Sequence, residues 1–380
     1  MGGERLVVVL GMHRSGTSAI TRSLRVLGVE LGDSLLPAQK DNPKGFFEDS
    51  DLNSLHIEML DAIGQKWDSI RSVLSCDVDR LEQLGFLEKA AGLLQQKLSL
   101  HSQFAFKDPR TAKLLGFWQK VFKVLGLDLS YLIVVRNPLS VAHSLATRDG
   151  LGIEKSYALW LRHLVDSLSY TAGKTRTLVE FDILMSNPEG ELRRLARDLA
   201  FGFDYREFEV FTGGFLQENL RHTRFEPEDL LNDPTCSPFI YEVYSYLRKL
   251  CQAGGDFAQT LSEKASAWQR AMASIETIFR LVDISESRAD ALNMEISLLT
   301  GTLAEKKAAV EELTQSLEMQ SERISELESY VCEGEFRLAQ LGTSLASLEF
   351  RLEEIYNCTS WRVTAPFRAL SRTLSKRSGE

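Results

Sequence analysis

Short apolar runs alternate with amphipathic stretches through the first 225 residues of the chain. The run Leu6–Leu10 is continuously apolar and rich in valine, as expected of a strand that is buried on both faces. Further strands are predicted at 104–106, 129–135 and 177–181, and helices at 17–28, at 111–125, from Pro138 and after Pro188. Strands that alternate with helices predict an α/β fold, in which helices flank both faces of a parallel sheet.

A different pattern begins near residue 261. With Ile296 at heptad position a, every later a position up to residue 352 is apolar, and only Lys306, Gln320 and Gly334 interrupt the apolar d positions. A sustained period of 3.5 residues predicts a long α-helical coiled coil over 261–357, about 140 Å long if it is continuous.

The apolar stripe of this coiled coil needs a partner helix. We expect a homo-oligomer or a separate partner protein. The alternative is an antiparallel bundle that folds back on itself near Gly301 or Gly334.

A helical linker interrupted by prolines, 226–260, precedes the coiled coil. A basic tail, 358–380, follows it, with five basic residues against one acidic residue and with aromatic side chains between them. Such a tail is a candidate for peripheral contact with a membrane or for docking to a partner, and the alternative is a solvated tail without either role.

Composition narrows the class of protein. The net charge of −9 and the pI of about 5.4 exclude a general nucleic-acid binder, but not a small anionic ligand that needs only a few local donors. The five cysteines are scattered without a CxxC pair, which indicates a reducing compartment. Leu6–Leu10 is too short for a signal peptide, and no stretch has the roughly 20 apolar residues of a membrane helix. We therefore expect a cytoplasmic protein.

The first predicted strand runs into the segment Gly11–Ser18, and a helix follows. Two glycines allow the backbone to bend around a phosphate, the amides at a helix start donate outward, and Arg14 adds a planar cation. Gly11 and Gly16 have the spacing of a Walker A loop, but Thr17 takes the place of its lysine. The strand 129–135 ends in Arg136 rather than in a magnesium-binding carboxylate. These features predict a phosphate site that does not depend on a metal.

Arg136 and Ser144 form a second anion-binding pattern, a cation at a strand end and a hydroxyl in the following helix. Together with the segment from Arg14 to Ser18, this pair resembles the sulfotransferase family that uses 3′-phosphoadenosine 5′-phosphosulfate (PAPS). The resemblance covers residues 5–225, so we expect a sulfotransferase domain at 1–225. It implies a P-loop-like parallel sheet and PAPS as co-substrate, with 3′,5′-adenosine bisphosphate as product. The residues expected to contact the donor are His13, Arg14, Ser15, Gly16, Thr17, Ser18, Arg136, Ser144 and, in a late segment, Arg221.

The family's histidine base has no counterpart in the sequence. The segment around Glu48 resembles the glutamate region of members that carry arginine in the loop. We expect Glu48 to be the base that takes the acceptor proton, with Phe46 and Phe47 raising its pKa by burial. Asp108 is the rival base, although it also suits the cap of a helix near Pro109. Arg14 is expected to stabilise the leaving group, and Lys107 to lie near the sulfonate.

The donor motifs do not identify the acceptor. The segment 360–368 resembles the ends of bacterial polysaccharide-synthesising glycosyltransferases, which implies a surface-glycan setting, a carbohydrate acceptor and a glycan-assembly partner. With the basic tail, it also implies a place at the inner face of the membrane. Two alternatives stay open. One is a kinase-like phosphotransferase, and the other is a coiled-coil scaffold whose nucleotide domain is not catalytic.

Overall fold

The computed structural model describes residues 5–39, 42, 44–216, 225–253 and 258–375. Four parallel strands form one sheet in the order β2-β1-β3-β4; they are β1 (Arg5–Leu10), β2 (Gln103–Lys107), β3 (Asp128–Val135) and β4 (Arg176–Glu180). Each strand lies where the apolar runs predict one. The α/β sheet with flanking helices is confirmed.

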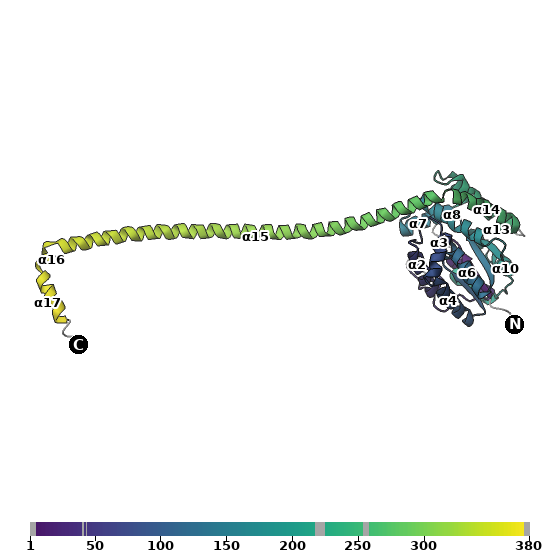
Figure 1. Cartoon of the computed structure of the whole chain (residues 1–380), viewed down its shortest axis with the longest axis horizontal. Coiled ribbons are helices and arrows are strands. Elements are labelled where there is room, and N and C mark those ends of the chain that lie inside the picture. The colour runs from purple at the N-terminus through teal and green to yellow at the C-terminus, as the bar shows by residue number, and fades with distance from the viewer. Residues whose placement is uncertain (1–4, 40–41, 43, 217–224, 254–257, 376–380) are drawn as a thin grey trace. The chain divides into compact units, whose positions relative to one another are not determined.

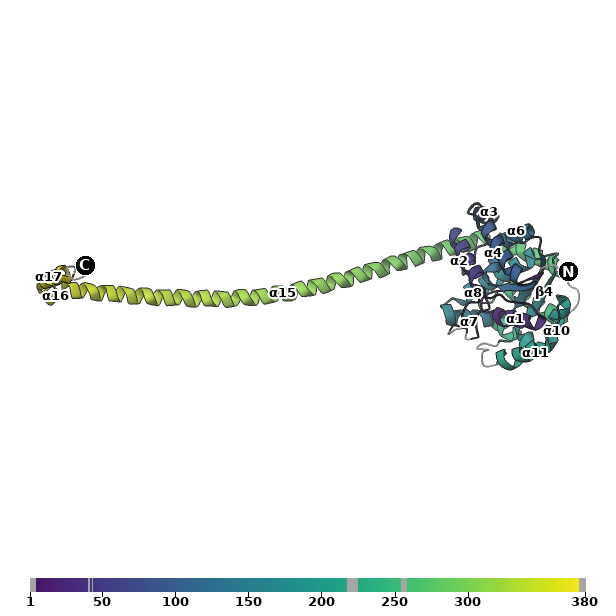
Figure 2. The same ribbon diagram turned by 90° about the horizontal axis from the view of Figure 1, so that it is seen from below.

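Alternate residues of β1 face two separate cores. Leu6, Val8 and Leu10 pack with the larger core and Val7 and Val9 with the smaller one. Figure 2 shows α4 (Phe86–Leu100) and α6 (Leu115–Leu125) on one side of the sheet and α1 (Thr17–Ser23) and α10 (Pro188–Asp198) on the other. A strand covered on both faces explains the unbroken apolar run in the sequence.

The helices before the linker region are α1 (Thr17–Ser23), α2 (Ser50–Ala62), α3 (Ser75–Gln83), α4 (Phe86–Leu100), α5 (Arg110–Lys113), α6 (Leu115–Leu125), α7 (Pro138–Asp149), α8 (Ile153–Tyr170), α9 (Phe181–Ser186), α10 (Pro188–Asp198) and α11 (Tyr205–Val210). A 3₁₀ helix (Leu24–Leu27) follows α1 and a π-helical turn (Phe211–Phe215) follows α11. Phe181, expected to end a strand, instead begins α9, because the Glu180 carboxylate accepts a hydrogen bond from the Ile183 amide and caps that helix.

The remaining helices are α12 (Pro227–Asn232), α13 (Pro238–Ala253), α14 (Ala258–Ser274), α15 (Glu276–Asn357), α16 (Thr359–Val363) and α17 (Ala365–Ser375). Residues 1–288 make one compact unit and residues 289–380 a second. Helix α14 differs from the coiled-coil expectation, because Leu261, Ala265, Trp268 and Met272 are buried in the core of the first unit. The same apolar spacing suits a core-facing helix and a coiled-coil seam, so the sequence pattern alone did not distinguish them.

Helix α15 is continuous over 82 residues, about 120 Å at 1.5 Å per residue. It appears in green to yellow in Figure 1. It continues through Gly301 and Gly334, so the fold-back alternative is wrong. All nine a positions from Ile296 to Leu352 are exposed in the single chain. None of the helices that the structure describes is long and apolar enough to cross a membrane.

Candidate active site

The loop after β1 leaves the carboxyl end of the sheet in a strained conformation. Arg14 has a φ of 65° and Gly16 a φ of 82°, and Gly16 caps the start of α1. A Cβ on Gly16 would lie 2.1 Å from Cδ2 of Phe181, so the loop also needs glycine for space. A non-glycine residue at positive φ is uncommon and is often found at functional sites.

The loop and the second anion-binding pattern are in direct contact. Arg14 Nε donates to Ser144 Oγ at 2.8 Å, and Arg136 Nη1 donates to the Arg14 carbonyl oxygen at 2.7 Å. The Arg136 guanidinium also lies 4.7 Å from the centroid of the Phe181 ring. Because β1 and β3 are neighbours in the sheet, residues 122 or more positions apart meet at one edge.

A cavity of about 170 Å³ opens beside this loop. Five cationic side chains line it: Arg14, Lys44, Lys107, Arg136 and Arg148. His13, Gly16, Thr17, Ser18 and Glu48 line it as well, whereas Ser15 is buried and absent from the lining. We call this space the loop cavity. Its balance of charge suits an anionic ligand.

A second cavity of about 390 Å³ adjoins the loop cavity. His13, Phe46, Glu48 and Arg148 line both spaces. Trp67 and a set of polar groups line only the second, namely Gln39, Asn53, Arg110 and Asp149. We call it the outer cavity. Glu48 therefore lies at the junction of an anion-binding space and a larger polar space.

Glu48 is held by two side chains. Lys107 Nζ lies 2.5 Å from Glu48 Oε1, and Asn53 Nδ2 donates to Oε2 at 3.1 Å. Lys107 also reaches Ser18 Oγ, at 3.5 Å, and so connects Glu48 to the loop. Burial raises the pKa of the Glu48 carboxyl above its ordinary value, against the opposing effect of the Lys107 ammonium. Such a carboxyl can accept a proton more readily than an exposed one.

Asp108 has a different environment. It is 1% exposed and lies outside the described linings of both cavities. Its oxygens accept hydrogen bonds from the Arg110 amide at 2.8 Å and from Asn53 Nδ2 at 3.0 Å. Burial on its own raises the pKa of Asp108, but His56 and Arg110 outweigh it and hold the pKa below its ordinary value.

His56 lies behind Asp108. Trp118 Nε1 donates to His56 Nε2 at 2.8 Å, and His56 Nδ1 lies 3.0 Å from Asp108 Oδ2. Asp108 thus accepts hydrogen bonds from Asn53 and Arg110 and has the His56 ring in close contact behind it. That arrangement suits a structural role better than proton transfer to a ligand.

His13 lies with its ring edge against Trp67, at a centroid distance of 4.7 Å. Burial lowers the pKa of His13 well below its ordinary value, and Arg110 and Arg148 add to that effect. The imidazole is therefore neutral near pH 7. Arg221 lies outside the described residues.

Sequence reasoning missed Asn53 and Trp67. Asn53 lies in the first turn of α2, where the nearest sequence feature is the cap residue Asp49. Trp67 lies between α2 and α3, in a stretch without a strand or helix pattern. Only the tertiary packing of α2 and of the stretch after it shows that both residues line the outer cavity.

Comparison with known proteins adds little. No protein-family model matches the sequence, and no curated protein matches it. Among solved structures, the sulfotransferase domain from the Synechococcus PCC 7002 olefin synthase has a TM-score of 0.37 and 14% identity, covering 70% of this chain and 94% of that one. The sulfotransferase domain from the curacin biosynthetic pathway has a TM-score of 0.33 and 13% identity, covering 71% and 98%. At these scores neither likeness bears on activity or substrate.

Proposed function

We propose that this chain transfers a sulfuryl group from PAPS to an acceptor hydroxyl, without a metal ion. The observation that supports this most directly is the contact between the two anion-binding patterns, from Arg14 to Ser144 and from Arg136 to the Arg14 carbonyl. Five cationic side chains line the loop cavity. They supply the positive charge needed to bind a nucleotide that carries phosphates on two sides of its ribose.

The reaction forms a bond between the acceptor oxygen and sulfur, while the bond from sulfur to the 5′-phosphate oxygen breaks. We assign the acceptor proton to Glu48, because this carboxyl lines both cavities and its pKa is raised. The electron pair stays on the phosphate, where Arg14 and the loop amides stabilise it. We assign Lys107 to the sulfuryl oxygens, since its ammonium contacts both Glu48 and Ser18.

Asp108 is the weaker candidate for the base. Its carboxylate already accepts hydrogen bonds from Arg110 and Asn53, and its lowered pKa makes it a poor proton acceptor. Through Asn53, which bonds to both carboxyl groups, Asp108 fixes the position of Glu48.

We propose a carbohydrate hydroxyl as acceptor, bound in the outer cavity. The lining supports this choice, because amide, carboxylate and guanidinium groups can hydrogen-bond several hydroxyls while Trp67 offers an apolar ring. The resemblance of segment 360–368 to glycan-assembly enzymes points the same way. We propose further that the reaction takes place in the cytoplasm and that the basic tail binds the inner face of the membrane, close to the glycan substrate.

We also propose that a second copy of this chain covers the apolar stripe of α15, in parallel and in register. In that arrangement each d residue meets its own copy, so the Gln320 amides of the two chains can hydrogen-bond, whereas the two Lys306 side chains must extend their ammonium groups to the water beside the seam. Arg323 at a g position then faces Glu328 at the following e position, and no such g–e pair joins like charges.

Calorimetric titration tests the donor site. We expect 3′,5′-adenosine bisphosphate to bind the wild-type chain and ATP with magnesium to bind at least tenfold more weakly. Arg14→Ala should weaken binding of the bisphosphate at least tenfold, since it removes a charged donor from the loop. Arg193→Ala is the matched control, because Arg193 is an exposed arginine on α10.

Tighter binding of ATP with magnesium would favour a kinase-like phosphotransferase. Tight binding of the bisphosphate, with no transfer from PAPS to any glycan, would favour a non-catalytic scaffold. Equal affinities of Arg14→Ala and Arg193→Ala would remove Arg14 from the donor site.

A further inference from the structure

The stretch between α2 and α3 forms one wall of the outer cavity. It contributes Trp67 to the lining, and it has no strand or long helix of its own. Trp67 contacts two of the four residues that line both cavities. The His13 ring lies 4.7 Å from it, and the Arg148 guanidinium carbon lies 5.4 Å from its centroid. We call residues 63–74 the wall segment.

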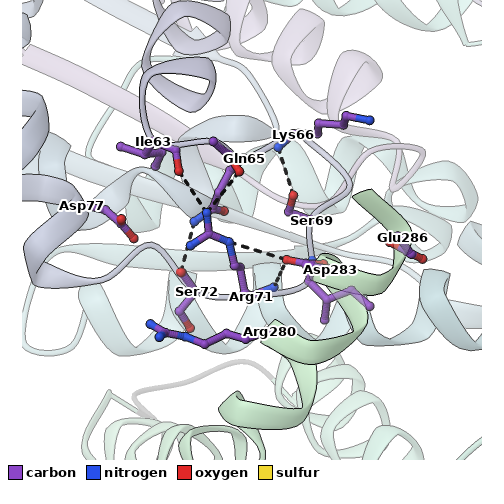
Figure 3. A network of polar contacts seen from close by, with 12 residues as sticks. Ile63, Gln65, Lys66, Ser69, Arg71, Ser72, Asp77, Arg280, Asp283 and Glu286 are labelled. Atoms are coloured by element: carbon purple, nitrogen blue, oxygen red, sulfur yellow. Dashed lines mark hydrogen bonds and ion pairs between the residues drawn. The ribbon is translucent and has the colours of Figure 1, made fainter. Parts of the chain in front are cut away.

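The backbone amides of the wall segment are bound by carboxylates from the start of α15. Asp283 Oδ1 accepts from the Ile70 amide at 2.8 Å, and Oδ2 accepts from the Arg71 amide at 3.0 Å (Figure 3). Glu276 accepts from the Ser72 amide at 2.8 Å and from the Ser72 hydroxyl at 3.0 Å. The amides of residues 70, 71 and 72 therefore donate to two carboxylates of a helix. In a sheet, such consecutive amides would instead pair with a neighbouring strand.

Buried ionic contacts reinforce this attachment. Arg162, 1% exposed, donates from Nη2 to Glu276 at 2.6 Å and from Nε to the Ile70 carbonyl at 3.1 Å. Lys155 Nζ lies 2.8 Å from the carboxylates of both Asp68 and Glu286. It therefore joins Asp68, which follows Trp67 in the wall segment, to α15. Asp283 itself is only 7% exposed, so loss of its carboxylate would leave buried amides without a partner.

The wall segment is also joined to itself. Arg71 Nη2 donates to the carbonyl oxygens of Ile63 and Gly64, at 3.0 and 3.1 Å (Figure 3). These bonds connect the start of the segment, next to α2, to the end that Asp283 and Glu276 bind. Trp67 lies between the start and the end. Its position therefore depends on carboxylates more than 200 residues away in the sequence.

We propose that Asp283 and Glu276 are positioning residues for the acceptor: by binding the wall segment, the start of the long helix shapes the outer cavity. This rests on the proposed function, in which the outer cavity takes the acceptor. Trp67 contacts His13 and Arg148 at the border of the loop cavity, whereas the donor-site hydrogen bonds from Arg14 to Ser144 and from Arg136 to Arg14 do not pass through the wall segment.

The test compares Asp283→Ala and Glu276→Gln with Glu295→Ala, an exposed carboxylate on the same helix, all in the full chain. Backbone hydrogen exchange is measured first, without any ligand. We expect residues 66–73 to exchange at least tenfold faster in Asp283→Ala, with a smaller effect in Glu276→Gln, which keeps one acceptor oxygen. Exchange at residues 14–18 and throughout the control variant should be unchanged. Unaltered exchange in the wall segment of both variants overturns the proposal.

Binding is measured next. The affinity for 3′,5′-adenosine bisphosphate should stay within twofold of wild type. The KM for 4-nitrophenyl β-D-glucopyranoside should rise at least tenfold, with a smaller change in kcat. A matching loss of bisphosphate affinity would show a general structural role and contradict the proposal. If the wild-type chain binds no bisphosphate, the proposed function fails, and the exchange experiment still decides whether α15 holds the wall segment.

A double-mutant comparison identifies the route of the effect. If Asp283 acts through Trp67, then Asp283→Ala should add less than twofold to the KM of Trp67→Ala. Glu276→Gln provides the same comparison with an uncharged side chain of the same shape, in case Asp283→Ala does not fold. If Asp283→Ala and Glu276→Gln each multiply the KM of Trp67→Ala by the same factor as they multiply the KM of the wild type, then neither residue acts through Trp67.

Discussion

Asn53 donates to both carboxyl groups of the site, and the two groups differ in what else surrounds them. Glu48 faces two cavities and has a raised pKa, because burial disfavours its charged form. Asp108 has neighbouring donors and a lowered pKa. Two carboxyl groups whose environments move their pKa values apart are typical of a base and a structural partner. The different roles of Glu48 and Asp108 thus depend on burial and on hydrogen-bond partners rather than on residue type.

Replacing the proposed base gives a prediction at this scale. We expect Glu48→Gln to lower kcat about 10²- to 10⁴-fold, because the acceptor proton then has no carboxylate to receive it. Affinity for 3′,5′-adenosine bisphosphate should change less than threefold. In the wild type, kcat should rise with pH through the raised pKa of Glu48, since only the ionised carboxylate is a base. That rise should be absent from Glu48→Gln.

Asp108→Asn provides the comparison for this experiment. If it lowers kcat while bisphosphate binding and folding are intact, and Glu48→Gln retains activity, the base is Asp108 and our assignment is wrong.

At the scale of elements, the site depends on how the loop after β1 meets α9. Gly16 begins α1 at a positive φ, and the Phe181 ring fills the space where a side chain would be. Phe181 also lies beneath the Arg136 guanidinium. The first turn of α9 therefore supports both anion-binding patterns. A change at Gly16 affects the backbone, the aromatic ring and the cation together.

Two glycine variants separate these effects. Gly16→Ala should lower the free energy of unfolding by about 2–5 kcal/mol, the sum of a left-handed backbone penalty of about 1–2 kcal/mol and overpacking of about 1–3 kcal/mol. Gly28→Ala should lower it by the backbone penalty alone, because Gly28 has a φ of 76° and nothing within 4 Å of the Cβ position. Urea unfolding measures both, and calorimetry should show weaker bisphosphate binding only for Gly16→Ala. Equal losses in the two variants would mean that Phe181 does not restrict the loop.

At the scale of the whole molecule, α15 has two different regions. Residues near its start are bound to the wall segment by Asp283 and Glu276, within the first compact unit. From Ile296 onward its apolar a and d residues are exposed in the single chain. An exposed apolar stripe of this length is unfavourable in water, so we expect it to be covered. The proposed second copy covers it without a change in the helix itself.

Light scattering tests this assembly. We expect the full chain to have twice the mass of one copy. Leu327→Lys should have the mass of a single copy, because it places a second pair of facing ammonium groups at d, between the apolar a residues Ile324 and Val331, in addition to the pair at Lys306. Ser329→Lys is the matched control, since position f faces away from a partner. Bisphosphate affinity should be equal in all three proteins. A monomeric wild type would contradict the proposal.

Orientation needs a separate measurement. In a background with Cys332 and Cys358 replaced by serine, Leu299→Cys should form a disulfide between copies under oxidation, because parallel helices in register bring the two residues 299 together. An antiparallel pair would hold them apart, and no covalent dimer would form.

The sequence by itself determined the strand positions, the loop from Gly11 to Ser18 and the helical heptad pattern from Ile296 onward, because these depend on local periodicity and on glycine at particular backbone angles; the structure decided that the helix is continuous through Gly301 and Gly334. It also brought Arg14, Lys107 and Asp108 forward as candidates, because they follow or end strands whose carboxyl ends meet at one edge of a parallel sheet, and it brought Glu48 forward by the resemblance of its segment to a family motif. Tertiary structure alone decided how Glu48 and Asp108 differ, that α14 belongs to the core, and that Trp67 and Asn53 line the outer cavity. These features depend on contacts between residues far apart in the chain, and neither periodicity nor residue type encodes which distant groups will share a hydrogen bond.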